Sequence, residues 1–260
     1  MKSMVQKRQI PITSPLRWTL VCAIAWLPVA GLQAEVSAKE IIKKVEENLR
    51  GKASVGEMLL VVQKDFVRKM LIQSWDDRAG DRFFLKIVKP QKDAGIRFLK
   101  DKGNMWQYLP RLGKEIQIEG SLMQNAWMGS DFSNDDLMKS SSLTDDYNHS
   151  FQKAAHADEW NIRLVPRPAA AVIWKHIDAR IRQSDGMPLE YRFYDQQNRL
   201  KKLQEFSSFE VMGGRKIPTL MKMTTLIKGN VQSTTYLKFV RIEFREALDS
   251  AIFSKANLKR

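Results

Sequence analysis

The segment at residues 101–137 reads DKGNMWQYLPRLGKEIQIEGSLMQNAWMGSDFSNDDL, and its apolar residues change period halfway along. In the first half, Trp106 and Tyr108 occupy alternate positions between a Lys-Gly-Asn turn and a proline. This alternation is typical of a β-strand, and proline commonly marks a strand end. A second turn with glycine leads into the polar and apolar alternation of residues 115–118. The first half therefore predicts two strands of a hairpin.

The second half has the spacing of helices. Apolar residues recur at helical intervals between Ser121, which can cap a first turn, and Gly129, which can end the run; they are Leu122, Met123, Ala126 and Trp127. Residues 130–137 then supply several N-cap residues and a cluster of acidic side chains, which a helix N-terminus favours. The pattern predicts two short helices that expose apolar side chains.

Three runs carry a resemblance to a known family: WQYLP at residues 106–110, AWMGSDFSNDDL at 126–137 and LDSAIF at 248–253. They resemble the periplasmic outer-membrane lipoprotein-sorting proteins, whose fold is similar to that of the lipoprotein carrier LolA and the receptor LolB. The resemblance implies an α+β, mainly β fold: a half-open antiparallel β-barrel with an N-terminal helix and short lid helices over a hydrophobic cavity. No arginine of this sequence is matched to the one that bonds lid to barrel in LolA.

The N-terminus indicates export. Residues 1–34 combine four basic residues, an apolar run at 18–31 and a Leu-Gln-Ala cleavage site before Glu35. The run is short for a bilayer span, which needs about 20 apolar residues. We interpret residues 1–34 as a cleaved signal peptide and 35–260 as one half-barrel domain located in the periplasm. An uncleaved membrane anchor is the alternative.

Cysteine content and charge exclude several classes of protein. The single cysteine, Cys22, lies within the signal, so the exported protein has no thiol and is neither a disulfide scaffold nor a thiol enzyme. The net charge of +14 falls to +10 without the signal, and residues 151–260 hold +9 of it. This excess either attracts anionic headgroups at a membrane surface, in transient contact, or covers solvated strand faces. Export argues against nucleic acid as a partner.

The rest of the chain predicts one helix and a series of strands. Ser37 and Glu40 form a capping box in front of a helix with an apolar stripe. Strands are predicted at residues 54–63, 66–75, 82–88, 96–100, 159–165, 172–182, 189–194, 200–207, 220–227 and 234–244. Turn residues at regular intervals between them favour an antiparallel meander. Several strands are apolar on both faces, so a helix, lid or ligand must cover the second face.

The sequence gives little support for catalysis, and we expect neither an enzyme nor a metal or cofactor site. His149, His156 and His176 are not spaced as metal ligands. The pairs at 135–136 and 145–146 are candidates for calcium ligands or an acid and base, but helix capping explains the first pair better.

Aromatic and methionine side chains are the better candidates for a binding site, because they cluster in the opening segment and methionine adapts to varied apolar shapes. The candidate ligand-binding residues are Trp106, Tyr108, Met123, Trp127, Met128 and Phe132. Ordinary core packing is the competing explanation. By resemblance, we expect a periplasmic carrier for a lipid or an acylated lipoprotein, which works with an inner-membrane exporter of the resistance-nodulation-division (RND) type. The alternative is a periplasmic sensor or scaffold that binds a protein, as the fold-related regulator RseB does.

Overall fold

The structure of the protein is a computed structural model that describes residues 36–138, 143–168, 170 and 172–260. The predicted signal peptide, residues 1–34, lies outside the described residues. Within the described part, Val36–Arg260 forms one compact unit.

Helix α1 (Ala38–Arg50) begins and ends where its sequence predicts. The Ser37 side chain accepts a hydrogen bond from the Glu40 amide, and the Glu40 carboxylate accepts one from the Ser37 amide at 2.9 Å. The helix ends at Gly51, whose φ of 63° favours glycine and whose missing side chain leaves room for Phe244. Ile42 is fully buried on the face that packs against the sheet.

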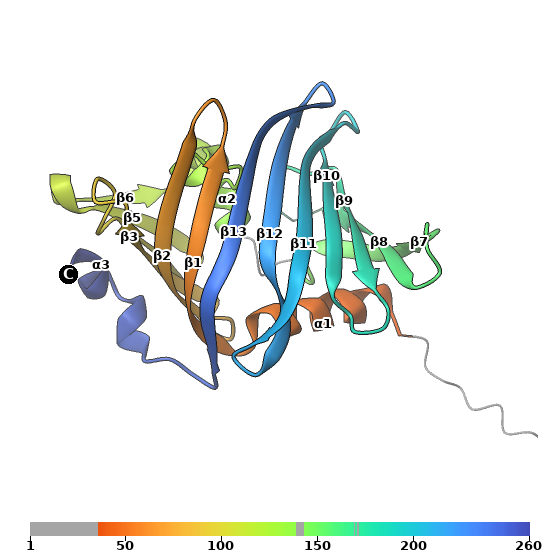
Figure 1. Ribbon diagram of the computed structural model, residues 1–260, viewed down its shortest axis with the longest axis horizontal. Helices are drawn as coiled ribbons and strands as arrows, with labels where there is room; N and C mark the ends of the chain where they lie inside the picture. Colours follow the sequence, from red (N-terminus) through yellow and green to blue (C-terminus); the bar gives the residue numbers. More distant parts are fainter. Residues whose placement is uncertain (1–35, 139–142, 169, 171) are drawn as a thin grey trace, which may run out of the picture. The chain divides into compact units, whose positions relative to one another are not determined.

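Thirteen strands of the described part form one curved antiparallel sheet, as predicted from the turn spacing (Figure 1). They are β1 (Ala53–Gln63), β2 (Val67–Asp77), β3 (Arg82–Lys89), β4 (Arg97–Asp101), β5 (Asn104–Leu109), β6 (Lys114–Ile118), β7 (Tyr147–Gln152), β8 (Glu159–Pro166), β9 (His176–Arg182), β10 (Pro188–Tyr194), β11 (Leu200–Met212), β12 (Arg215–Ile227) and β13 (Asn230–Arg245). Their spatial order is β6-β5-β4-β3-β2-β1-β13-β12-β11-β10-β9-β8-β7. Because β1 pairs with β13, the first and last strands meet in the middle of the sheet and β6 and β7 form its edges.

The chain between β6 and β7 therefore passes from one edge of the sheet to the other. This passage contains η2 (Gly120–Gln124), η3 (Trp127–Gly129) and α2 (Asn134–Met138), and we call residues 120–138 the lid segment. The prediction of a single helix over residues 121–128 is wrong. Asn125 and Ala126 between the two 3-10 turns have extended backbones with ψ of 146° and 118°, so no helix continues through them, and Met128 with φ of 51° is left-handed.

Several strands differ from their predicted bounds. β7 was not predicted, because its sequence YNHSFQ lacks a clear apolar alternation. β11 and β12 are longer than expected because they continue past Pro218, which pairs with Phe209. The irregularity beside this pair is Ser208, whose φ of 53° is left-handed and whose carbonyl accepts a hydrogen bond from the Thr219 hydroxyl at 2.8 Å. Pairing of β12 with β13 begins only at Leu220, so the missing N–H of Pro218 interrupts no pair with β13.

Three apolar clusters fix the layers. One joins α1 to strands β7–β12, and the second lies between the lid segment and strands β1–β6. The third lies on the other face of β3–β5, where it is covered by η4 (Ser250–Phe253) and α3 (Lys255–Lys259). η1 (Pro110–Leu112) turns the chain from β5 to β6. No helix of the described residues is long and apolar enough to span a bilayer.

Candidate functional site

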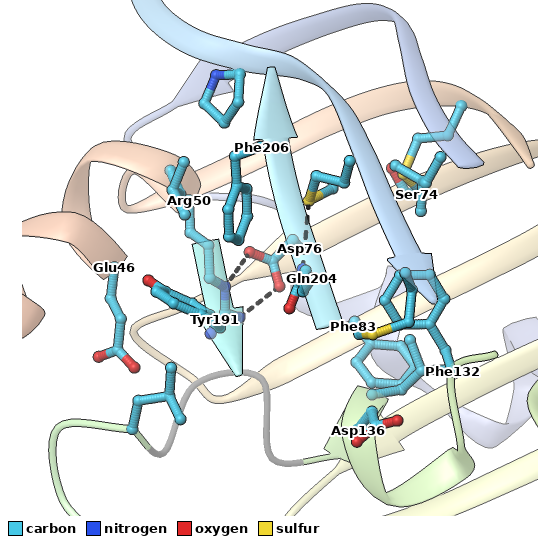
Figure 2. Close-up of a pocket in the computed structure, with 18 of the residues that line it drawn as sticks. Glu46, Arg50, Ser74, Asp76, Phe83, Phe132, Asp136, Tyr191, Gln204 and Phe206 are labelled. Atoms are coloured by element: carbon cyan, nitrogen blue, oxygen red, sulfur yellow. Dashed lines mark hydrogen bonds and ion pairs between the residues drawn. The ribbon is translucent and has the colours of Figure 1, made fainter. Parts of the chain in front are cut away.

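An apolar cavity of about 340 Å³ lies between α1, the lid segment and the inner face of the sheet (Figure 2). Most of its wall is contributed by the following apolar side chains: Leu49, Met58, Phe83, Leu85, Trp127, Phe132, Leu137, Val172, Trp174, Ile177, Tyr191, Phe193, Phe206, Ile217, Met221, Met223, Leu237, Phe239 and Ile242. Ligand pockets commonly measure about 300–1,000 Å³, whereas well-packed cores have few voids larger than a water molecule. The volume therefore marks a binding space rather than a packing defect.

A register shift in the centre of the sheet widens the apolar wall. Met58 pairs with Phe239 and Glu57 pairs with Arg241, so Val240 has no partner on β1. The extra residue changes the alternation, and both Phe239 and Ile242 line the cavity although they are three positions apart. Such a shift depends on pairing with β1 and has no signal in the local sequence.

The lid segment is attached to the central strand β13 through Asp131, which is buried. Its carboxylate accepts hydrogen bonds from the hydroxyls of Ser233 and Thr235, the latter at 2.6 Å. The Thr235 hydroxyl oxygen also accepts one from the Asp131 amide at 2.9 Å. Hydrogen bonds to a charged group contribute about 1.5–3 kcal/mol each. This cluster therefore fixes the middle of the lid segment to the sheet.

Three cations from the sheet hold other parts of the lid segment. Arg68 on β2 donates from Nη1 to the carbonyl of Met128 at 2.8 Å, and its Nη2 pairs with Asp93 at 2.8 Å. Lys202 Nζ lies 2.5 Å from Asp136, and Lys100 Nζ donates to the carbonyl of Met138 at 2.6 Å; those two contacts belong to the α2 end of the segment. Arg68 is thus an arginine that bonds the covering segment to the sheet, which sequence reasoning did not identify.

The acidic start of α2 has the role predicted for it. The Ser133 amide donates to the Asp136 carboxylate at 2.8 Å, and the Asp136 amide donates to the Ser133 hydroxyl at 3.0 Å. This is a capping box. In the described part of the chain, no group of three or more histidine, cysteine or acidic residues is arranged to hold a metal ion.

One end of the cavity is polar. Arg50 of α1 donates to both carboxylate oxygens of Asp76 on β2, at 2.9 Å from Nε and 2.6 Å from Nη2 (Figure 2). Burial opposes the charge of Arg50, but the Asp76 carboxylate raises the pKa of Arg50 above its usual value. Burial also raises the pKa of Glu46, one turn earlier, despite a hydrogen bond of 2.5 Å from the Thr144 hydroxyl. The net charge at this end of the cavity is therefore zero or slightly negative.

The structure distributes the six predicted ligand-binding residues over both faces of the sheet. Trp127 and Phe132 line the cavity, and the Trp127 ring packs edge-on against Phe98 with centroids 5.4 Å apart. Met123 and Met128 pack in the same cluster as Trp127 without lining the cavity. Trp106 and Tyr108 belong to the cluster on the opposite face, with Phe253 and Leu258, and do not line it.

Most of the cavity wall was not identified from the sequence. It comes from β9–β13 and from α1, which are far in sequence from the lid segment. A partial signal was present, because Met221 and Met223 alternate on a predicted strand with apolar residues on both faces. The Arg50–Asp76 pair has no such signal, since its members lie on separate elements.

Comparisons with known proteins agree with this architecture. A family model described as "Uncharacterized protein" matches residues 79–260. No curated protein matches the sequence significantly.

Three solved structures share the fold. A DUF1329 family protein from Desulfovibrio piger has a TM-score of 0.73 at 19% identity and covers 85% of this chain and 97% of its own. A putative outer membrane lipoprotein-sorting protein domain from Vibrio parahaemolyticus has a TM-score of 0.71 at 20% identity, and the match covers 86% of this chain and 98% of that one. A LolA superfamily protein from Nitrosomonas europaea also has a TM-score of 0.71 at 20% identity, and the match covers 86% of this chain and 100% of that one. The predicted fold class is confirmed.

Proposed function

We propose that this chain is a periplasmic carrier that encloses an acyl chain of a lipid or lipoprotein, a function suggested by the fold it shares with a putative outer membrane lipoprotein-sorting protein domain and a LolA superfamily protein. The apolar cavity between α1, the lid segment and the sheet is the observation that supports this most strongly. LolA-like proteins are periplasmic, and the exported location proposed for this chain agrees with them.

The energetics of an acyl chain favour an enclosed site over a groove. Each buried CH₂ group contributes about 0.8 kcal/mol, so a chain of roughly 15 carbons loses on the order of 12 kcal/mol when it leaves a membrane for water. A carrier competes with the membrane only if its walls cover most of the chain. The cavity has walls on three sides, from α1, the sheet and the lid segment.

The charged groups at the wall indicate which part of the cargo is enclosed. Among the described residues, the carboxylates of Asp76 and Asp136 line the cavity and are already paired, with Arg50 and Lys202 respectively. A phosphate or a free carboxylate that entered would have to compete with these carboxylates for the two cations. We propose that the hydrocarbon tail enters the cavity and that any charged head group stays outside it.

Transfer requires that the lid segment opens and closes without covalent chemistry. Opening breaks the polar contacts of Asp131, Arg68 and Lys202, and these groups then form hydrogen bonds with water instead. The family resemblance supports an inner-membrane exporter of the RND type as the donor or acceptor of the cargo.

Lipid analysis of the purified protein tests the proposal. The protein is isolated from the periplasm without detergent, extracted with organic solvent, and analysed by mass spectrometry. We expect about one acyl chain or acylated molecule per protein. Leu237→Trp should reduce this occupancy because Leu237 lines the cavity, whereas Val240→Trp, on the same strand but half-exposed and outside the cavity, should not.

An empty cavity in the wild-type protein would contradict the carrier. If a stoichiometric protein co-purified instead, the scaffold alternative would replace it.

A further inference from the structure

Two neighbouring hairpins expose large apolar side chains at one end of the sheet. Phe66 in the β1–β2 turn and Val67 at the start of β2 are 58% and 61% exposed, and Val231 near the start of β13 is 66% exposed. Ile227 precedes the β12–β13 turn and is also exposed. Turn positions usually carry glycine, asparagine or aspartate, so an exposed phenylalanine at position 66 is unusual.

Strand register brings the two turns together. Gln63, the last residue of β1, pairs with Thr234 of β13, so the turn after β1 and the turn before β13 lie at the same end of adjacent strands. Figure 1 shows the β1–β2 and β12–β13 turns projecting beyond the sheet at this end. We call the exposed apolar side chains at these two hairpin ends the tip surface: Phe66, Val67, Ile227 and Val231. Single exposed apolar residues are common, but a group of them on neighbouring hairpins is a candidate interaction site.

Basic side chains surround the tip surface. Lys64 and Lys69 flank the first pair, and Lys228 lies in the second turn; all three are exposed. Asp65 is the acidic residue within these two turns. Aromatic and aliphatic side chains with lysines at their rim match the interface of an anionic bilayer, where apolar groups enter the headgroup region and lysines meet lipid phosphates.

The tip surface is also continuous with the attachments of the lid segment. Arg68, next to Val67, holds the Met128 carbonyl, and Ser233, two residues after Val231, donates to Asp131. Both hairpins therefore carry a polar contact to the lid segment within two residues of their exposed apolar side chains. A surface that bound these turns would lie directly beside the contacts that hold the cavity closed.

We propose that the tip surface docks on an anionic phospholipid bilayer and so places the lid end of the cavity at the membrane. The proposal rests on the carrier function, because it assigns the place where cargo enters and leaves. Docking requires no change in the cavity itself. The two functions can therefore be lost separately.

Vesicle binding tests the docking surface. Vesicles of phosphatidylcholine with phosphatidylglycerol are sedimented with the protein, and vesicles of phosphatidylcholine alone serve as the reference. We expect binding to the anionic vesicles that weakens as salt rises. The double variant Phe66→Ser/Val231→Ser should bind them at least about tenfold more weakly, because two apolar side chains no longer enter the interface.

A matched control lies at the other end of the sheet. Val211, near the β11–β12 turn, is 75% exposed, and Val211→Ser should bind vesicles as the wild type does. The sole cysteine of the sequence is Cys22. Two variants that carry Cys22→Ser, one with Phe66→Cys and one with Val211→Cys, are each labelled on the new thiol with a polarity-sensitive dye. Dye emission should shift to shorter wavelength on anionic vesicles at position 66 and stay unchanged at 211.

The proposal would be overturned if the tip variant and Val211→Ser lost vesicle binding equally, or if the dye at position 211 shifted its emission. It would also be overturned if the wild-type protein did not bind anionic vesicles. Binding of a soluble fluorescent fatty-acid probe is measured on the same samples. The tip variant should retain it. If the wild-type protein did not bind the fatty-acid probe, the carrier function would be contradicted instead.

Discussion

Replacing Asp131 by alanine tests how the lid segment is held over the cavity. The substitution removes the acceptor of two hydroxyl groups that have no access to water, since Thr235 is fully buried and Ser233 is 5% exposed. Both donors would remain in place without the carboxylate. The lid segment would lose its attachment to β13 while Arg68 and Lys202 still hold its two sides.

The magnitude follows from these contacts. Two hydrogen bonds to a carboxylate contribute about 1.5–3 kcal/mol each, and the relief of burying that carboxylate offsets part of this, which leaves a net cost of about 2–4 kcal/mol. At 1.4 kcal/mol per factor of ten, opening of the lid segment should become about 30-fold to 700-fold more frequent. Ser233→Ala in the same molecule should restore part of the loss, because it removes one unsatisfied donor.

Hydrogen exchange resolved by residue measures this opening. In Asp131→Ala, amides of residues 127–138 should exchange faster by the factor above, while amides in the middle of β13 change less. Asp145→Ala is the control, since the Asp145 side chain is 83% exposed. Unchanged exchange in residues 127–138 would refute the role of Asp131. A Ser233→Ala effect that simply adds to that of Asp131→Ala would show that the two side chains do not act as a pair.

Two further predictions concern α1. Burial raises the pKa of Glu46, so the folded protein keeps a proton there at pH values where the unfolded chain, with a pKa of about 4.3, has lost it; Glu46 therefore makes folding less favourable as pH rises through that window. Glu46→Gln should match the wild type in urea unfolding below about pH 4 and exceed it at neutral pH, and a constant difference across pH would contradict this. Ile42→Ala should lower the free energy of unfolding by about 2–5 kcal/mol because Ile42 is fully buried, whereas Lys44→Ala on the exposed face should change it little. An Ile42→Ala loss below about 1 kcal/mol would mean that α1 is not packed on the sheet as described.

The strands were predictable because their signals are local. Asp185-Gly186, Gly213-Gly214 and Gly229-Asn230 each fall in a turn between strands, and alternation between such turns identifies most strands. The failures occur where pairing overrides local preference. Pro218 lies inside β12, where it pairs with Phe209 of β11 while the pairing of β12 with β13 begins only at Leu220.

The site was less predictable than the fold. Trp106 and Tyr108 are close in sequence to Trp127, but strand alternation directs Met105 to the lid side and Trp106 to the opposite cluster. The cluster of aromatic residues in sequence was therefore divided by the sheet. Conversely, Glu46, Asp76 and Met221 share one cavity only because α1 crosses the inner face of distant strands, which no local pattern records.

The central claim is that the cavity accepts a hydrocarbon chain, and a series of ligands with one fixed uncharged head group and acyl chains of about 8 to 18 carbons tests it most directly. Isothermal titration below the aggregation limit of each ligand gives the dissociation constants. Affinity should rise about fourfold per added CH₂, equivalent to about 0.8 kcal/mol, until the chain fills the cavity, and then stay level. Affinity independent of chain length would contradict the account, because a ligand that leaves its tail in water gains nothing from a longer one.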